Sequence, residues 1–190
     1  MTKQNGTSQQ GSKLHVAIVG AGIGGLATAL AMLRAGLKVD IFEQAHTLET
    51  LGAGIHIGPN GARILLRLGL GAQIDAVAFQ TVAEETRRWD DNHLLARFTN
   101  GEENIAKFGA PAYSFHRGEL QRILREAVPD HVVHLGQRCV AVAQQPDRAE
   151  LAFADGSIAT ADVVVGADGI HSILRNTMST DSLHFYGLCS

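Results

Sequence analysis

Apolar and polar positions along this chain follow a pattern that predicts an α/β protein. An apolar run at residues 14–19 leads, through three glycines, into a helix on which Ile23, Leu26 and Leu30 share one face. A second apolar run at residues 38–42 completes a strand–helix–strand unit. Such a unit is the building block of a Rossmann-like sheet covered by helices.

The remaining pattern predicts further helices and strands. One amphipathic helix is expected after Pro59-Asn60, and another begins near Arg117 and ends at Pro129. Residues 80–98 are strand-like, with a hairpin turn at residues 90–92, and suggest a second layer or subdomain. Short strands are then predicted at residues 132–135, 138–143, 149–153 and 157–161.

The glycines after the first strand have the G-x-G-x-x-G spacing, as Gly20, Gly22 and Gly25. In such a turn the first glycine allows the tight reversal, the second lets a pyrophosphate approach the backbone, and the third lets helix and strand pack closely. Glu43 ends the second strand, where a carboxylate can accept hydrogen bonds from an adenosine ribose. These residues predict a dinucleotide site, with a purely structural turn as the alternative. The spacing does not distinguish an FAD-binding site from an NAD-binding site.

Three other stretches have both a functional and a structural interpretation. Glycines at residues 52–58 indicate either backbone close to a ligand or a loop that enters a helix. Arg117 lies in the first turn of its helix, where the macrodipole disfavours a cation, so it either reaches a bound anion or is merely exposed. The run from Asp162 predicts a buried parallel strand that carries Asp168-Gly169 to its carboxyl end, before a short helix at residues 173–175. Asp168 is therefore either directed at a nucleotide or a helix cap.

Composition and charge narrow the class of protein. The 190 residues are 45% hydrophobic and 18% charged, and the net charge of -3 gives no reason to expect nucleic acid as a partner. No run is apolar enough to span a bilayer, and the polar residues 1–13 predict a disordered leader without a signal-peptide core. Cys139 and Cys189 have no recognisable spacing and predict reduced thiols in the cytoplasm. The histidines form no metal-ligand pattern, so no metal site is predicted.

Taken in order, these motifs resemble the flavin-dependent aromatic hydroxylase family, the group related to para-hydroxybenzoate and salicylate hydroxylases. The resemblance runs from about Leu14 to Arg175. The matching stretches are Gly20-Ala-Gly-Ile-Gly-Gly25, Glu43, Gly52-Ala-Gly-Ile-His56, Pro59-Asn60, His116-Arg117 with Leu120 and Leu124, and Gly166-Ala-Asp-Gly-Ile-His-Ser172 with Arg175. The resemblance implies a Rossmann-like, three-layer FAD-binding fold with an inserted, strand-rich fragment of a substrate domain.

Roles in FAD binding follow from the resemblance. The glycines of the turn would hold the pyrophosphate and Glu43 the adenosine ribose, while Arg117 and Gln121 would reach the ribityl-diphosphate. The other implied contacts are the backbone from Gly54 to His56 near the flavin, Val140 at the adenine, and Asp168 with Gly169 as a second fingerprint linked to FAD and NAD(P)H.

The chemistry that the resemblance implies is hydroxylation of an aromatic or phenolic small molecule. NAD(P)H acts as a transient reductant of the flavin, O₂ adds to form a flavin hydroperoxide, and the substrate ring takes one oxygen atom. Because the cofactor supplies the reactive species, no nucleophile–base triad is needed and no catalytic residue is assigned. A place near the active site is open to His56 and Tyr113, but both are interpreted as packing or surface residues.

Two features depart from the family. An arginine often faces the cofactor where Glu49 stands, and a third fingerprint, a Gly-Asp pair, occurs nowhere in these 190 residues. We therefore expect the N-terminal part of such an enzyme, with weak or no activity alone. The expected segments are a leader (1–13), two FAD-binding segments (14–79 and 111–176), partial substrate-layer strands (80–110) and a truncated start of the substrate domain (177–190).

Two other functions stay open on the sequence alone. One is a non-catalytic, truncated module that binds flavin or another nucleotide, and the other is an NAD-dependent dehydrogenase. The strand-rich insert and the late strand that ends at Asp168-Gly169 disfavour the dehydrogenase. The sequence does not specify the substrate, the oligomeric state, or whether NADH or NADPH is the reductant.

Overall fold

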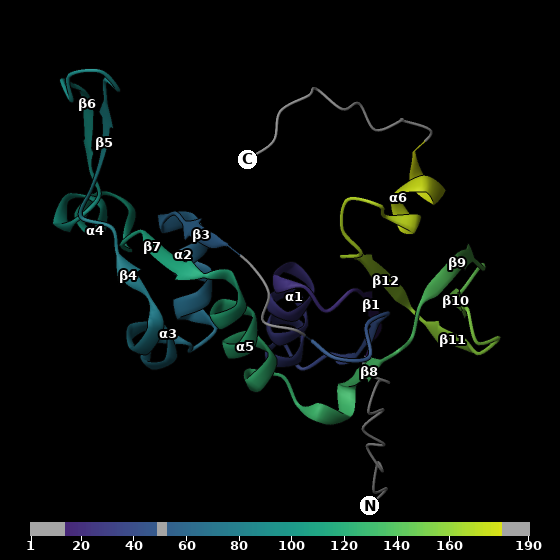
Figure 1. Cartoon of the computed structure of the whole chain (residues 1–190). Helices are drawn as coiled ribbons and strands as arrows, with labels where there is room; N and C mark the ends of the chain where they lie inside the picture. Colours follow the sequence, from purple (N-terminus) through teal and green to yellow (C-terminus); the bar gives the residue numbers. More distant parts are fainter. Residues whose placement is uncertain (1–13, 49–52, 180–190) are drawn as a thin grey trace, which may run out of the picture.

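The computed structural model describes residues 14–48 and 53–179. Its elements form two groups that lie side by side, as Figure 1 shows: a sheet-centred group that holds both the first and the last described elements, and a helix-rich group built from residues 54–127. Several predictions concern residues outside the described ranges. They are those for the leader, for Glu49, Gly52 and Cys189, and for residues 180–190.

A parallel four-stranded sheet forms the centre of the first group. Its order is β12-β1-β2-β8, and every neighbouring pair is parallel. The strands are β1 (His15–Val19), β2 (Lys38–Glu43), β8 (Val133–Leu135) and β12 (Val163–Gly166). Because parallel neighbours need a crossover connection, the chain passes through helix α1 (Ile23–Arg34) between β1 and β2.

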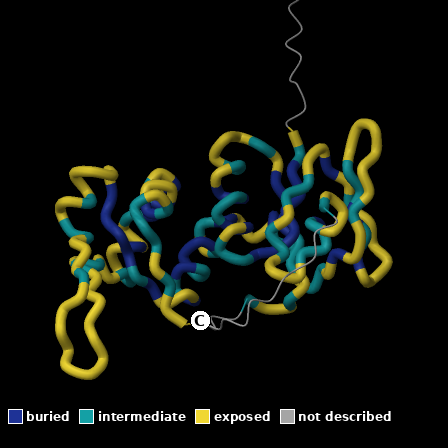
Figure 2. The backbone as a smooth tube through the Cα atoms, turned by 90° about the horizontal axis from the view of Figure 1, so that it is seen from above, coloured by how far each residue is buried: buried dark blue, intermediate teal, exposed yellow. Residues whose placement is uncertain are grey.

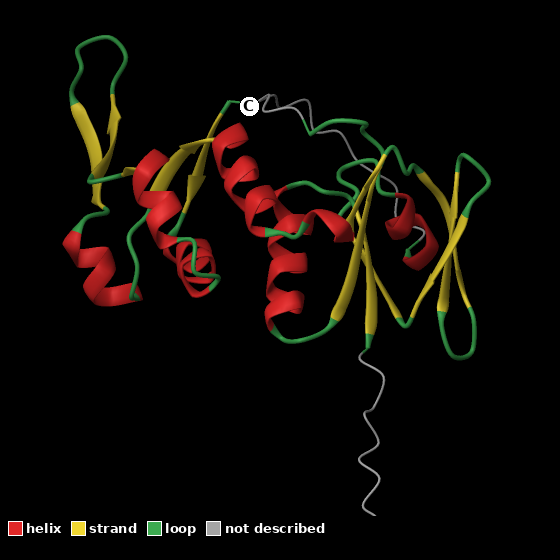
Figure 3. Ribbon diagram, turned by 90° about the horizontal axis from the view of Figure 1, so that it is seen from below, coloured by secondary structure: helices red, strands yellow, loops and turns green. Residues whose placement is uncertain are grey.

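Different layers cover the two faces of this sheet (Figure 3). Alternate side chains of β1 point to opposite faces: Val16 and Ile18 pack in the core shared with α1, whereas Ala17 and Val19 pack in a second core. An antiparallel sheet and a short helix cover the second core, and they are β9 (Cys139–Gln144), β10 (Ala149–Phe153), β11 (Ile158–Ala161) and α6 (Ile173–Met178). This three-layer order is the α/β fold class that the sequence predicts.

Helices and short strands make up the second group. Its antiparallel sheet has the order β3-β7-β4, and the β5–β6 hairpin is separate from it. The strands are β3 (Gly54–Ile57), β4 (Phe79–Gln80), β5 (Ala83–Arg87), β6 (Leu94–Thr99) and β7 (Tyr113–His116). The helices are α2 (Pro59–Arg67), α3 (Gly71–Val77), α4 (Glu102–Phe108) and α5 (Arg117–Ala127), and the 3-10 turn η1 (Asp130–Val132) leads from α5 to β8.

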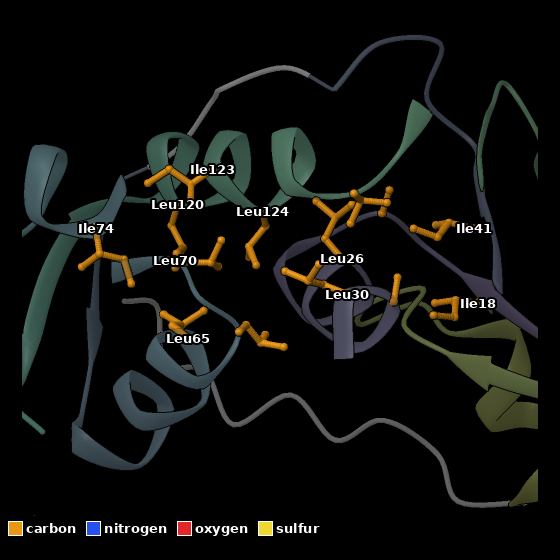
Figure 4. Packing of buried hydrophobic residues seen from close by; sticks show 14 of the residues in the cluster. Ile18, Leu26, Leu30, Ile41, Leu65, Leu70, Ile74, Leu120, Ile123 and Leu124 are labelled. Atoms are coloured by element: carbon orange, nitrogen blue, oxygen red, sulfur yellow. The ribbon is translucent and has the colours of Figure 1, made fainter. Parts of the chain in front are cut away.

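One apolar core joins the two groups, because α5 lies between them. Leu120 and Leu124 of α5 are completely buried. In Figure 4, Leu124 lies between Leu70 of the helix-rich group and Leu30 of α1. The same cluster contains Ile18 of β1, so the core extends from the central sheet through α1 and α5 into the second group.

The β5–β6 hairpin stands away from both cores. Figure 2 shows its backbone as almost wholly exposed, and Trp89 at its tip is 95% exposed. The turn predicted at residues 90–92 is confirmed, since the Arg88 backbone N–H donates to the His93 carbonyl at 2.8 Å and Asn92 has a φ of 59°.

The structure corrects three details of the sequence-based prediction. Helices α3 and α4 are not predicted, because seven-residue helices show too little periodicity. Helix α4 follows the strand-like residues 80–98, within the segment 80–110 that was assigned to substrate-layer strands. The glycine-rich stretch around Gly54 forms β3 rather than a loop. Strand β12 is parallel as predicted but lies at the edge of the described sheet, so Val163 is 38% exposed and not buried.

None of the described helices is long and apolar enough to cross a membrane.

Asp40 of β2 links two other strands through their histidines. Its Oδ2 lies 2.7 Å from Nε2 of His15 in β1, and its Oδ1 lies 2.7 Å from Nε2 of His134 in β8. Burial raises the pKa of Asp40, but the hydrogen bonds to His134 and His15 outweigh it and leave the pKa below its ordinary value. The carboxylate form is therefore favoured in the folded protein.

We expect Asp40→Asn to destabilise the protein near neutral pH and to cost progressively less as the pH falls. Because the folded pKa is lowered, the carboxylate contributes stability above the ordinary aspartate pKa, and this contribution disappears as the pH falls through the folded value. Urea unfolding between neutral pH and about pH 3 measures the effect. Asp147→Asn, at an exposed position, serves as the control, and an equal loss from Asp40→Asn at every pH would contradict the prediction.

We expect Leu124→Ala to lower the free energy of unfolding by about 2–5 kcal/mol, because it opens a cavity where α5 joins the two groups. Urea unfolding followed by circular dichroism measures the loss. Leu95→Ala, at a side chain that is 58% exposed, is the matched control and should change stability by less than about 0.5 kcal/mol. Similar effects of the two variants would show that α5 is not part of a common core.

Candidate functional site

The turn between β1 and α1 approaches its neighbours so closely that two of its glycines have no room for a side chain. A Cβ on Gly20, whose φ is +104°, would lie 2.3 Å from the carbonyl oxygen of Ala167. A Cβ on Gly25 would lie 1.9 Å from the carbonyl oxygen of Gly20. Gly22 differs, because nothing lies within 4 Å of its Cβ position and it caps the N-terminus of α1. The first and third glycines thus allow close packing, while the second faces open space.

Glu43 and Gln121 hold Ala21, which lies between these glycines, one at its N–H and the other at its carbonyl. The Oε2 atom of Glu43 accepts a hydrogen bond from the Ala21 backbone N–H at 2.7 Å, and its Oε1 accepts one from the Ala45 N–H at 2.9 Å. The Nε2 of Gln121, from α5, donates to the Ala21 carbonyl at 3.1 Å. Residues from β2 and α5 therefore fix the conformation of the turn before any ligand is bound.

Two cavities meet at Gly22 and Glu43, beside the carboxyl ends of β1 and β2. The first has a volume of about 290 Å³, and its lining includes Gly20, Glu43, Cys139, Asp168 and Gly169. The second has a volume of about 550 Å³, and its lining includes Gly22, Glu43, His46, Arg117 and Gln121. We call the two cavities together the strand-end groove. Its place agrees with the rule that ligands of open α/β sheets bind beyond the carboxyl ends of the strands.

Asp168 has a clear structural role within the groove. Its Oδ2 accepts a hydrogen bond from the Ile173 backbone N–H at 2.7 Å, and its Oδ1 accepts one from Ser172 Oγ at 2.6 Å. The carboxylate thus binds the first turn of α6, although the N-cap residue itself is Ser172, whose Oγ accepts the Arg175 N–H at 3.0 Å. It also lines the first cavity, so the nucleotide-directed interpretation stays a prediction.

The second cavity of the groove contains a cation that is available to an anionic ligand. The carboxylates of Glu43 and Asp168 already accept hydrogen bonds from the protein. The guanidinium of Arg117, by contrast, lines the second cavity and has no hydrogen-bond or ion-pair partner among the described residues. An unpaired arginine beside the open N-terminus of α1 is suited to bind phosphate groups.

Three positions that the resemblance implies lie outside the groove lining. Val140 is 40% exposed on β9, and its neighbour Cys139 lines the first cavity instead. Gly54 and His56 belong to β3, where Nδ1 of His56 lies 3.4 Å from Oγ of Ser114. The start of β3 nevertheless adjoins the groove, because the Arg117 backbone N–H donates to the Ala53 carbonyl at 3.1 Å.

The structure also places residues that the sequence left without a role. Cys139 is a free, buried cysteine, and burial raises the pKa of its thiol, so the neutral form is favoured. Tyr113 is 4% exposed and belongs to the apolar core, in agreement with its interpretation as a packing residue rather than one near an active site. His46 lines the second cavity, and its position shortly after Glu43 is the only sequence signal that indicated this placement. No group of three or more metal-ligating side chains occurs within the described ranges.

Comparisons with known proteins agree with this geometry. A family model described as an FAD binding domain matches residues 13–187. The 3-amino-4-hydroxybenzoate 2-monooxygenase PtmB3 of Streptomyces platensis is 47% identical over 173 residues, which cover 91% of this chain and 44% of that protein. The 6-hydroxynicotinate 3-monooxygenase of Bordetella bronchiseptica is 37% identical over 163 residues, which cover 86% of this chain and 43% of that protein.

A solved structure shares the fold as well. Klebsiella pneumoniae HpxO, solved in complex with FAD and uric acid, superposes with a TM-score of 0.78 at 28% sequence identity. The superposition covers 86% of this chain and 41% of HpxO. The chain thus spans less than half the length of each of these relatives.

We expect Gly25→Ala to destabilise the protein by about 3 kcal/mol or more, because the added methyl group meets the rigid backbone of Gly20. Gly24→Ala is a closely matched control, since nothing lies within 4 Å of its Cβ position. That variant should stabilise α1 by about 0.5–1 kcal/mol. Urea unfolding of both variants measures the difference, and a stable Gly25→Ala protein would mean that helix and strand do not pack this closely.

Proposed function

This chain belongs to the family of FAD-binding domains, and we propose that it forms the FAD-binding part of a monooxygenase that hydroxylates an aromatic or phenolic small molecule. The observation that carries the proposal is the composition of the strand-end groove. Around the open N-terminus of α1 at Gly22, it combines the carboxylate of Glu43 with the guanidinium of Arg117, which has no partner within residues 14–48 and 53–179. A nucleotide diphosphate next to a ribose requires these complementary groups.

The residues along the groove follow the order of the parts of FAD that they would bind. The Glu43 carboxylate would accept hydrogen bonds from the adenosine ribose, and the backbone at Gly22 would face the diphosphate without steric hindrance. Arg117 would bind the diphosphate from α5, while Gln121 fixes the Ala21 peptide beneath it. The remaining residues proposed for the cofactor are Gly20, Gly25, Gly54, His56, Val140, Asp168 and Gly169.

The chain's own contribution to catalysis is binding and orientation. Electron transfer from NAD(P)H and the use of O₂ belong to the chemistry of the flavin itself. The end of the groove at Arg117 adjoins the start of β3, so a dinucleotide that extends from Glu43 past Arg117 would point toward the helix-rich group. We propose that the flavin lies on this side.

The names of the relatives support the substrate class. PtmB3 is named for 3-amino-4-hydroxybenzoate and the Bordetella enzyme for 6-hydroxynicotinate, both of them hydroxylated aromatic acids. We propose a small hydroxylated aromatic acid as the substrate of the whole protein, with O₂ and NAD(P)H as co-substrates. We also propose a cytoplasmic location, in keeping with the free thiol of Cys139.

Titration of the purified chain with FAD tests the proposal. We expect flavin absorbance to remain with the protein after desalting, at close to one FAD per chain. Binding of NADH without flavin would instead support a dehydrogenase. Failure to bind either dinucleotide would contradict the proposed function. Bound FAD with little or no hydroxylation agrees with it, because the chain spans less than half the length of its relatives.

We expect Glu43→Ala to weaken FAD binding by about 1–3 kcal/mol, or about 5- to 150-fold in Kd, because a charged hydrogen-bond acceptor is lost. Glu43 also holds the glycine turn, so urea unfolding of the variant must accompany the titration. Glu84→Ala, at an exposed carboxylate in the β5–β6 hairpin, is the control and should leave the Kd unchanged. An unaltered Kd for Glu43→Ala would place the adenosine elsewhere.

A further inference from the structure

The peptide group that joins Ala21 to Gly22 has a partner on its carbonyl side alone. The Ala21 carbonyl oxygen accepts a hydrogen bond from Nε2 of Gln121 at 3.1 Å, and no other group within residues 14–48 and 53–179 donates to it. The Gly22 N–H has no acceptor in the same part of the chain. Because a carbonyl oxygen accepts and never donates, the atom of Gln121 that faces it is the amide nitrogen.

The geometry of this peptide group determines where its free N–H points. The C=O and N–H of a planar trans peptide point in opposite directions, and none of the described peptide bonds is cis. The N–H of Gly22 therefore points away from Gln121. Gly22 lines the first cavity beside Gly20 and Glu43. The hydrogen bond from α5 thus leaves a backbone donor free at the N-terminus of α1, where an anion is stabilised.

The same peptide group has a second accessible orientation when this hydrogen bond is absent. Gly22 has a φ of -70°, and rotation of the peptide before it would bring this φ to a positive value. Glycine adopts positive φ without steric cost, and the two commonest β-turn types differ by such a rotation. The flipped peptide would direct the Ala21 carbonyl, and not an N–H, toward an anionic ligand.

The two neighbouring peptide groups have fixed orientations of their own. Glu43 accepts the Ala21 N–H at 2.7 Å, which holds the peptide before the one in question. The Gly22 carbonyl accepts the Leu26 N–H at 2.9 Å, which holds the peptide after it. Neither contact involves the Ala21 carbonyl or the Gly22 N–H. Gln121 is therefore the described side chain that selects between the two orientations.

Apolar packing places Gln121 at the turn. Its neighbours on α5, Leu120 and Leu124, are completely buried, and Leu124 lies beside Leu30 of α1 in Figure 4. The amide of Gln121 carries no charge at any pH. Its effect on an anionic ligand therefore arises from the backbone that it orients and not from attraction between charges.

We propose that Gln121 is a positioning residue for the cofactor, which keeps the Gly22 N–H directed at the diphosphate by holding the Ala21 carbonyl, and that it is not a ligand of the ribityl chain. The inference rests on the proposed function, since it assigns this role within the same site. A donor that is already oriented binds its ligand without first paying the cost of ordering. Loss of the hydrogen bond lets the peptide populate the flipped orientation, in which the diphosphate meets a carbonyl oxygen.

The test compares Gln121→Met with the wild type in the Kd for FAD, ADP and adenosine. Methionine has nearly the same length but no N–H donor. We expect Gln121→Met to weaken FAD and ADP by the same factor, about 3- to 10-fold, because both contain the diphosphate. Adenosine lacks the diphosphate, so its Kd should not change. Gln145→Met, at an exposed glutamine in the turn after β9, is the matched control and should bind all three ligands as the wild type does.

Nuclear magnetic resonance adds a readout at the peptide itself. In the wild type, ADP should move the amide proton resonance of Gly22 downfield, because this N–H gains a hydrogen bond to a charged oxygen. In Gln121→Met the shift should be clearly smaller. An equal shift in both proteins would overturn the inference, because the Gly22 N–H would then reach the diphosphate without Gln121.

The pattern across the three ligands separates this inference from its alternatives. A loss confined to FAD would make Gln121 a direct ligand of the ribityl chain and overturn the inference. An equal loss for adenosine, together with a lower melting temperature, would overturn it by showing a purely structural role. Unchanged binding of FAD and ADP would overturn it too, while leaving the proposed function intact. A wild-type chain that does not bind FAD would overturn the proposed function, and this inference with it.

Discussion

The close approach of the turn after β1 to the backbone around it is the constraint on which the rest of the structure depends. Gly20 lies so close to the carbonyl of Ala167, and Gly25 so close to the carbonyl of Gly20, that neither has room for a Cβ atom. Because neither position has a side chain, α1 begins directly beyond the ends of β1 and β12. This contact brings the open N-terminus of the helix, the carboxylate of Glu43 and the loop at Asp168 to one place.

Helix α5 couples this turn to the rest of the molecule. One face of the helix contributes Leu120 and Leu124 to the core that joins the two groups. Its first turns contribute Arg117 and Gln121 to the groove, where Gln121 holds the Ala21 carbonyl. The position of the arginine therefore depends on apolar packing some distance away. Changes in packing along α5 should alter the geometry of the strand-end groove as well as the stability of the protein.

Much of the sheet-centred group could be predicted from the sequence, because its strands are apolar runs and its turns carry glycine or aspartate. The placement of Glu43 and Asp168 at one cavity followed from the rule that ligands bind at the carboxyl ends of parallel strands, whereas Arg117 was singled out by its place in the first turn of its helix and by the family resemblance. Helices α3 and α4 could not be predicted, since their short sequences show no clear apolar face. The sequence pattern also could not show that β12 lies at a sheet edge, because the run of valines is equally suited to a central strand.

The residues missed in the groove depend on contacts between distant parts of the chain. Cys139, rather than Val140, faces the first cavity because of the alternation of β9, whose pairing with β10 shifts register at Ala152/Phe153. His46 is placed by a glycine in the turn after β8, which no local pattern reveals. The role of Gln121 in holding the turn likewise required the packing of α5 against α1.

The exposed β5–β6 hairpin has a consequence for how the molecule unfolds. Its two strands pair only with each other, and most of their side chains lie outside both apolar cores. A two-stranded ribbon without a packed face is only marginally stable in water. Its cross-strand hydrogen bonds therefore open in local fluctuations that leave the central sheet intact, and its amide protons exchange with solvent well before those of β1 and β2. The chain thus consists of at least two cooperative units of very different stability, and the groove belongs to the more stable one.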